Sequence, residues 1–138
     1  MTQELTGGCL CGAVRYRITA APVEVLYCHC GMCRRAQGAP VVAWLTVPIG
    51  AFEVTQGALK AYRSSQRAFR RFCGDCGTPL NWVAADAPRY IDVSIASLDT
   101  PEAYGPTLHL WAASRIPWFD TADRLPRYPG EERPKNYG

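Results

Sequence analysis

All seven cysteines of this 138-residue chain fall into three short clusters. The clusters are Cys9-Leu-Cys11, Cys28-His-Cys-Gly-Met-Cys33 and Cys73-Gly-Asp-Cys76. Thiolates at such short spacings can present several soft ligands to one metal ion, and zinc is the ion most often bound in this way. The spacing therefore predicts zinc binding, with two pairs that can close a four-cysteine site and a triplet that leaves a fourth position unfilled.

The two cysteine pairs are interpreted as halves of one structural site. A single Cys-x-x-Cys such as residues 73–76 can be a redox pair, but the other thiolate clusters in the chain favour a metal knuckle. Gly74 and Gly77 allow the tight backbone of such a knuckle. Zinc shared with Cys9 and Cys11 would join the start of the chain to a late hairpin and stabilise the fold.

The triplet of Cys28, Cys30 and Cys33 allows two interpretations. In the first, a fourth ligand such as His29, His109 or an acidic residue completes a second structural site. In an extended segment, however, His29 points away from its two neighbours, and in the alternating run around His109 a hydrogen-bonded histidine is the commoner outcome. In the second interpretation the fourth position stays open, and the bound ion can bind and activate a substrate.

Arginines lie next to two of the clusters in the sequence. Arg34 and Arg35 directly follow the triplet, and Arg71 belongs to a group of three arginines that precedes the last pair. Such charges can form a solvated surface, offset the negative charge of thiolate-bound zinc, or hold the carboxylates of an anionic substrate through paired hydrogen bonds. We treat Arg34, Arg35 and Arg71 as candidate substrate contacts.

Short extended segments must position these clusters. Residues 13–18 alternate apolar and basic side chains, which predicts a strand with one buried face, and β-branched or aromatic runs predict further strands. These runs are residues 23–27, 41–47, 52–54, 59–63, 67–72, 80–83, 90–95 and 107–112. Only residues 33–37 and 101–104 are candidates for a helical turn. The prediction is one mostly β domain of residues 1–125, followed by a loosely packed, charged and proline-rich tail of residues 126–138.

Composition and charge narrow the function classes. With 48% hydrophobic and 20% charged residues, the chain can form one ordinary core. A net charge of +3 and the lack of a long basic tract argue against a nucleic-acid partner. The longest apolar stretch, residues 41–45, is too short to cross a bilayer, and no secretory segment is visible. We therefore expect a cytoplasmic protein whose thiols stay reduced.

Three stretches of the chain together resemble the glutathione-dependent formaldehyde-activating enzyme family, which shares its domain with centromere protein V. They are residues 7–16 (GGCLCGAVRY), 28–34 (CHCGMCR) and 72–80 (FCGDCGTPL). Residues 97–101 and 109–118 are also similar to the family, so the resemblance covers nearly the whole chain. It implies a β-tent fold, in which small antiparallel sheets are pinned by zinc.

The resemblance also implies a role for each cluster. Cys9, Cys11, Cys73 and Cys76 match the family's structural zinc site, whereas Cys28, Cys30 and Cys33 match a second zinc site associated with activity. The implied reaction is that of a carbon–sulfur lyase, in which glutathione or a similar small thiol adds to an aldehyde such as formaldehyde. The alternatives are a non-catalytic zinc module that binds a protein or nucleic-acid partner, and a protein that stores zinc. The oligomeric state is not predicted.

Overall fold

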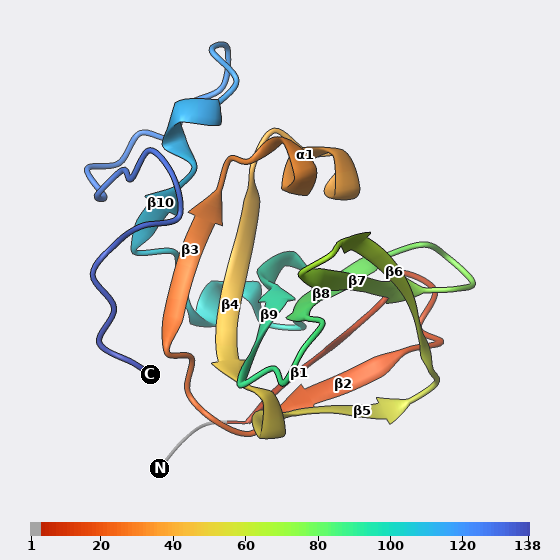
Figure 1. Ribbon diagram of the computed structural model, residues 1–138. Helices are drawn as coiled ribbons and strands as arrows, with labels where there is room; N and C mark the ends of the chain where they lie inside the picture. The colour runs from red at the N-terminus through yellow and green to blue at the C-terminus, as the bar shows by residue number, and fades with distance from the viewer. Residues whose placement is uncertain (1–3) are drawn as a thin grey trace.

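The computed structural model describes residues 4–138, which contain ten strands in two sheets (Figure 1). A three-stranded sheet has the order β1-β2-β5 and consists of β1 (Leu5–Gly8), β2 (Arg15–Ile18) and β5 (Phe52–Gln56). The second sheet has the order β10-β3-β4-β9-β8-β7-β6. Its strands are β3 (Glu24–Cys28), β4 (Val42–Pro48), β6 (Leu59–Ser65), β7 (Ala68–Cys73), β8 (Pro79–Ala84), β9 (Tyr90–Ser94) and β10 (Leu108–Leu110).

The prediction of a mostly β fold is confirmed, with a difference in strand pairing. Nine strands pair antiparallel with their neighbours, but β10 runs parallel to β3 and places His109 beside Tyr27 and Leu110 beside Cys28. Parallel strands need a long crossover, and here the strands from β4 to β9 lie between them in the chain. The larger sheet is therefore mixed. β1 was not predicted, since half of its residues are glycines, which weaken a strand signal.

β4 separates two apolar clusters because its successive side chains point to opposite faces of the sheet. Leu45 and Val47 belong to the main core and are fully buried. Val42 and Trp44, on the other face of the same strand, belong to a smaller cluster that also contains Cys28 and Cys33. Two of the three triplet cysteines therefore lie in an apolar environment of their own, apart from the main core.

The helical segments are short, and α1 (Gly31–Gln37) follows directly on β3 at one end of the long sheet, with the three-stranded sheet at the other end (Figure 1). The turn expected at residues 33–37 is confirmed, and α1 ends at Gly38, whose φ of +63° suits glycine. The remaining helical segments are the 3₁₀ turns η1 (Ile49–Ala51), η2 (Ile95–Ser97), η3 (Pro101–Ala103) and η4 (Ala112–Ser114). Within residues 4–138, no helix has the length and apolarity needed to cross a membrane.

The C-terminal residues 126–138 were expected to lie loosely on the surface. Most of them are exposed, but the segment is attached to the sheet at two places. Beside β10, the Tyr128 N–H donates to the carbonyl of His109 (2.9 Å). Further along, Arg133 forms an ion pair with the buried carboxylate of Glu24 in β3, to which Tyr137 also donates a hydrogen bond (2.7 Å). These anchors hold the tail against the edge of the larger sheet.

Candidate metal centres

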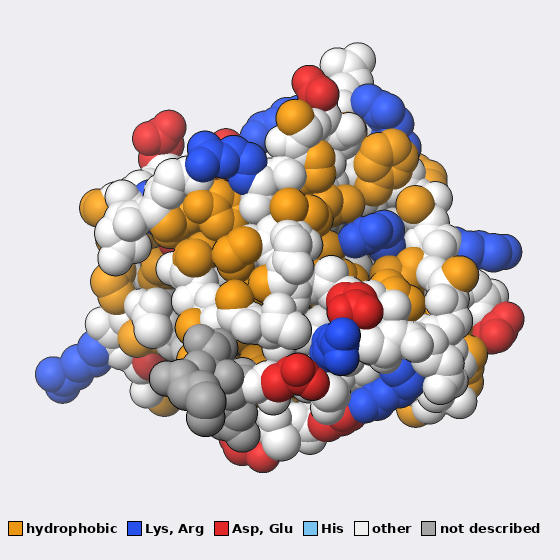
Figure 2. Space-filling view, turned by 90° about the horizontal axis from the view of Figure 1, so that it is seen from below, with side chains coloured by type: hydrophobic (Ala, Val, Ile, Leu, Met, Phe, Trp, Pro, Cys, Tyr) orange, Lys and Arg blue, Asp and Glu red, His pale blue; other side chains and the backbone are white. Residues whose placement is uncertain are grey.

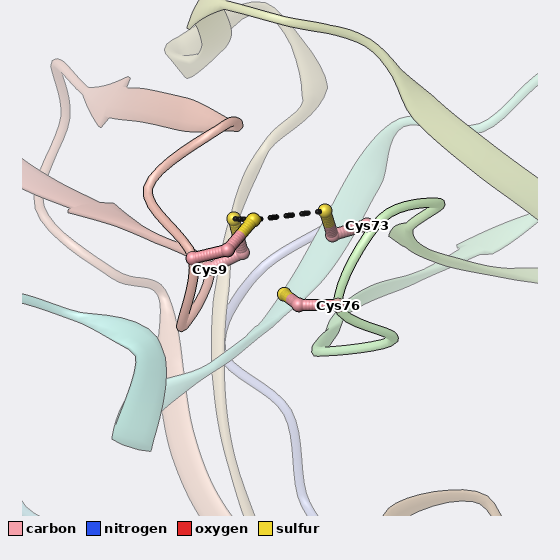
Figure 3. A group of neighbouring side chains, drawn as sticks. Cys9, Cys73 and Cys76 are labelled. Carbon is pink, nitrogen blue, oxygen red and sulfur yellow. Dashed lines mark hydrogen bonds between the residues drawn. The ribbon is translucent and has the colours of Figure 1, made fainter.

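The four paired cysteines converge on one point, with Cys9 facing Cys73 and Cys76 (Figure 3). Cys9 and Cys11 lie in the loop after β1, whereas Cys73 ends β7 and Cys76 lies in the turn before β8. The Cys11 sulfur is 3.7 Å from that of Cys9 and 3.9 Å from that of Cys73. Four sulfurs at about 2.3 Å from a zinc ion form a tetrahedron with edges of about 3.8 Å. The cluster therefore fits a closed, four-thiolate zinc site.

The backbone around these cysteines positions two of the sulfurs and donates hydrogen bonds to them. Gly77 adopts φ +79°, which lets its N–H turn back to the carbonyl of Cys73 (2.8 Å). The N–H of Asp75 donates to the Cys73 sulfur (3.4 Å), and the N–H of Val14 donates to the Cys9 sulfur (3.2 Å). Hydrogen bonds of this kind favour the thiolate, which is the form that binds metal.

The triplet cysteines also converge, around the junction between β3 and α1. Cys28 ends β3, Cys30 caps the N-terminus of α1, and Cys33 lies in its first turn, with the three sulfurs within 4.8 Å of one another. Hydrogen bonds from Cys28 and Cys33 lower the pKa of Cys30 to about 2, while the interaction with Cys30 raises the pKa of Cys28. One cysteine of the triplet, Cys30, therefore ionises easily. Ionising all three would place like charges close together, so three thiolates need a cation between them.

In the part of the chain that the structure describes, no histidine or carboxylate lies within the same distance of all three triplet sulfurs. His29 and His109 instead bond to each other, with 2.8 Å between Nε2 of His29 and Nδ1 of His109. The geometry brings neither histidine to the sulfurs as a fourth ligand. The triplet fits a zinc ion held by three cysteines with one position open to another molecule.

A guanidinium group lies against the triplet from a neighbouring strand. The two terminal nitrogens of Arg70, in β7, are 3.7 and 3.6 Å from the Cys33 sulfur. A nearby cation favours the thiolate form of cysteine. The sequence alone did not single out Arg70, because its approach to Cys33 depends on how β7 lies beside α1.

A cavity of about 570 Å³ lies between α1 and the strands β4, β6, β7 and β8. The triplet cysteines do not line it, but Arg70 does, and the same guanidinium contacts the Cys33 sulfur. The volume of the cavity suits a small-molecule ligand. Aromatic side chains, among them Trp44, make much of the wall, whereas Arg35, Arg70 and Arg71 supply positive charge. Among residues 4–138, no aspartate or glutamate lines this cavity. The cavity therefore favours an anionic ligand with an apolar part.

Arg71 and Asn81 form a polar corner of this cavity. They are partners in the register of β7 and β8, and Nε of Arg71 donates to Oδ1 of Asn81 (2.8 Å). Burial lowers the pKa of Arg71, for which residues 4–138 provide no carboxylate partner. The Nδ2 atom of Asn81, whose side chain is 2% exposed, has no hydrogen-bond partner among these residues either. Both groups can donate to an anion bound in the cavity.

The structure thus places the arginines predicted from the sequence in two different settings. Arg35 and Arg71 line the cavity. Arg34 is not among the lining residues, and its Nε donates to the main-chain carbonyl of His29 (3.3 Å). Asn81 was missed, although a lone amide within the apolar run Leu80 to Val83 is a signal that the sequence contains.

The fold and the site define a small, mostly β protein with two cysteine clusters, one of four and one of three, each of which could hold a metal ion. Residues 4–114 match the family model described as glutathione-dependent formaldehyde-activating enzyme. Because this match covers most of the chain, the protein belongs to that family, and the predicted resemblance is confirmed.

Two known proteins are similar to this chain. The chain is 33% identical to an uncharacterised lyase of Schizosaccharomyces pombe, and the alignment covers 56% of each protein. The chain therefore matches just over half the length of that relative. The crystal structure of a Rhodobacter sphaeroides protein superposes with a TM-score of 0.59 at 25% identity, covering 73% of this chain and 97% of that one.

Proposed function

We propose that the protein is a zinc-dependent enzyme of the carbon–sulfur lyase type that adds a small thiol to an aldehyde. The observation that carries the proposal is the three-thiolate centre of Cys28, Cys30 and Cys33, which lacks a fourth ligand within residues 4–138 and lies beside a cavity with uncompensated arginines. Membership of the family and the similarity to a lyase support it. Glutathione is the proposed thiol and formaldehyde the proposed aldehyde.

The reaction needs no oxidant or reductant. A carbon–sulfur bond forms between the thiol and the carbonyl carbon, the sulfur–hydrogen bond breaks, and the carbonyl oxygen ends as a hydroxyl group. Zinc bound to the triplet would supply a Lewis acid that stabilises a thiolate at neutral pH. A second zinc ion, bound to the paired cysteines, would be structural.

The protein's own residues would bind and orient the thiol compound. We propose that Arg71 and Asn81 hold a carboxylate, with Arg35 on another part of the cavity wall. Arg70 lies between this cavity and the Cys33 sulfur, and its charge would favour an anionic sulfur nearby. The large side chain of Trp44 would exclude water from the apolar part of the ligand.

The alternative is a non-catalytic zinc module that binds a protein or nucleic-acid partner. On the face seen in Figure 2, which is turned away from α1, acidic and basic side chains lie interspersed around exposed apolar groups. A nucleic-acid surface would instead gather basic side chains in one patch or stripe. Three arginines that form no ion pair within residues 4–138, Arg35, Arg70 and Arg71, line a cavity of small-molecule size. The geometry therefore favours an enzyme, and the proposal places it in a reducing compartment such as the cytoplasm.

The proposal is tested by exchange NMR of glutathione with formaldehyde, which measures how fast the free thiol and its hydroxymethyl adduct interconvert. The zinc-loaded protein is expected to accelerate this exchange, and the Cys30→Ser protein, folded but without the second ion, is expected not to. Equal exchange rates with and without the protein, for glutathione and for other small carboxylate-bearing thiols, would contradict the proposal.

A further inference from the structure

A continuous line of hydrogen bonds runs through the protein from the triplet to the surface. Nε2 of His29 is 2.8 Å from Nδ1 of His109, and Nε2 of His109 is 3.0 Å from a carboxylate oxygen of Asp123. Both histidines are fully buried, whereas the side chain of Asp123 is 25% exposed. The line joins a residue that lies between two candidate metal ligands to a loop near the end of the chain.

The parallel pairing of β10 with β3 brings the two histidines together. His109 lies beside Tyr27 in the register, and the N–H of His29 continues the ladder to the carbonyl of Leu110 (3.1 Å). The rings of Tyr27, His109 and His29 are stacked, with centroid distances of 4.8 and 5.0 Å. Because side chains alternate along an extended segment, His29 occupies one face while Cys28 and Cys30 turn to the other.

The partners along the line determine where its protons lie. Hydrogen bonds from Thr121 and His109 hold the pKa of Asp123 at about 2, so its carboxylate is ionised and can only accept. Nε2 of His109 must then carry a hydrogen, and in the neutral imidazole the lone pair on Nδ1 accepts from Nε2–H of His29. Neutral His29 keeps a lone pair on Nδ1, an atom that is buried and has no partner among residues 4–138.

This line fixes the segment that carries two of the three triplet cysteines. His29 is held at its N–H by Leu110, at its carbonyl by Arg34 and at its ring by His109. Because the ring and both main-chain groups of His29 are hydrogen-bonded, the backbone of the neighbouring residues Cys28 and Cys30 is restricted in its conformation. Partners behind a metal site commonly set ligand orientation in this way, and losing one costs 10- to 100-fold in metal affinity or activity.

We propose that His109 and Asp123 are positioning residues for the second metal centre, acting through His29 to hold Cys28 and Cys30 in the geometry that binds the ion. The inference rests on the proposed binding of zinc at the triplet. It adds two residues, far away in the sequence, that touch neither the metal nor the substrate but determine how firmly the metal is held.

The test compares three variants of one loop. Asp123→Ala removes the acceptor at the end of the line, and Asp123→Asn keeps an oxygen that can accept from His109. Asp120→Ala is the matched control, because both aspartates accept a main-chain N–H within the same loop. Asp120 accepts from Thr121, and Asp123 accepts from Leu125. Zinc affinity of each centre is measured by stepwise competition with a chromophoric chelator, and thermal unfolding is followed in parallel.

Asp123→Ala is expected to weaken zinc binding at the second centre by about 10- to 100-fold while the first centre keeps its ion. Asp123→Asn and Asp120→Ala are expected to retain the wild-type affinity. Unchanged affinity in Asp123→Ala, or equal weakening of both centres, would overturn the inference. A wild-type protein that binds only one ion would contradict the proposed function itself, and this inference with it.

A second measurement uses the wild-type protein and does not depend on how a variant folds. Long-range proton–nitrogen NMR reports which nitrogen of each imidazole carries the hydrogen. Both His29 and His109 are expected to carry it on Nε2. If neither Nε2 of His29 nor Nδ1 of His109 carries a hydrogen, no hydrogen bond joins the two rings and the inference is overturned.

Discussion

Replacing Cys11 by serine isolates the contribution of the structural metal centre from that of packing. Cys11 is exposed, unlike Cys9 and Cys73, which are buried in the main core. Its side chain therefore contributes little by burial, and a surface substitution of this kind normally changes the free energy of unfolding by no more than about 0.5 kcal/mol. Any larger loss of stability must come from the metal.

The expected loss is far larger than that. Binding of a structural zinc ion contributes on the order of 10 kcal/mol to folding, whereas a domain of this size has a total stability of about 5–15 kcal/mol. The ion would join the loop after β1 to the turn between β7 and β8, which are more than sixty residues apart in the chain. Cys11→Ser removes one of the four ligands and is therefore expected to lower the free energy of unfolding by several kcal/mol, because the three remaining thiolates hold the ion less firmly.

The assay is urea unfolding followed by circular dichroism, together with the zinc content of the purified protein. Leu10→Ser is the matched control, since Leu10 is the neighbouring residue and is 89% exposed. The control should unfold at the wild-type urea concentration, and wild-type protein stripped of zinc should be destabilised at least as much as Cys11→Ser. If Cys11→Ser unfolds within about 0.5 kcal/mol of Leu10→Ser, the account of a structural zinc at this cluster is refuted.

Three further predictions concern other parts of the molecule. Cys30→Ser should release one zinc ion and abolish turnover but keep a cooperative unfolding transition, because Cys30 is only half-buried; zinc content and circular dichroism check this. Arg71→Gln should raise KM for a carboxylate-bearing thiol by about 10- to 100-fold, the value of a charged hydrogen bond, with the exposed Arg67→Gln as control in steady-state kinetics. Burial raises the pKa of Asp92 to about 6, so the folded state binds more protons than the unfolded state between about pH 4 and about pH 6, and stability falls as the pH rises through this window. Asp92→Asn should remove that slope and gain stability relative to wild type at neutral pH, as measured by urea unfolding across the window.

The cysteine clusters and most strands could be predicted because their signals are local. The spacing of Cys73 and Cys76 indicates a metal knuckle, and the alternation around Tyr16 predicts a strand whose apolar face is buried, as the structure shows. Pairing of β1 with β2 could not be predicted from Leu5–Gly8, since that strand depends on its partner rather than on its own residues.

The rest of the site depends on contacts between distant segments. Arg70 reaches Cys33 because β7 faces α1 across the cavity, and nothing in the sequence around either residue indicates this. His109 meets His29 because β10 adds to the sheet in parallel beside β3, a pairing that an expectation of antiparallel sheets missed. Arg34 and Arg35 were both predicted from the sequence to contact the substrate. Successive residues of a helix face different directions, however, and of these two only Arg35 lines the cavity.

The central claim is that the second centre holds its metal with three cysteines and leaves a place for the thiol. Cadmium NMR tests it most directly, since the spectrum gives one resonance for each bound ion in protein loaded with cadmium and kept free of other thiols. Adding glutathione should move one resonance toward the position of the four-thiolate centre and leave the other unchanged. Two resonances that already lie at the four-thiolate position, or that both stay in place when glutathione is added, would contradict the account.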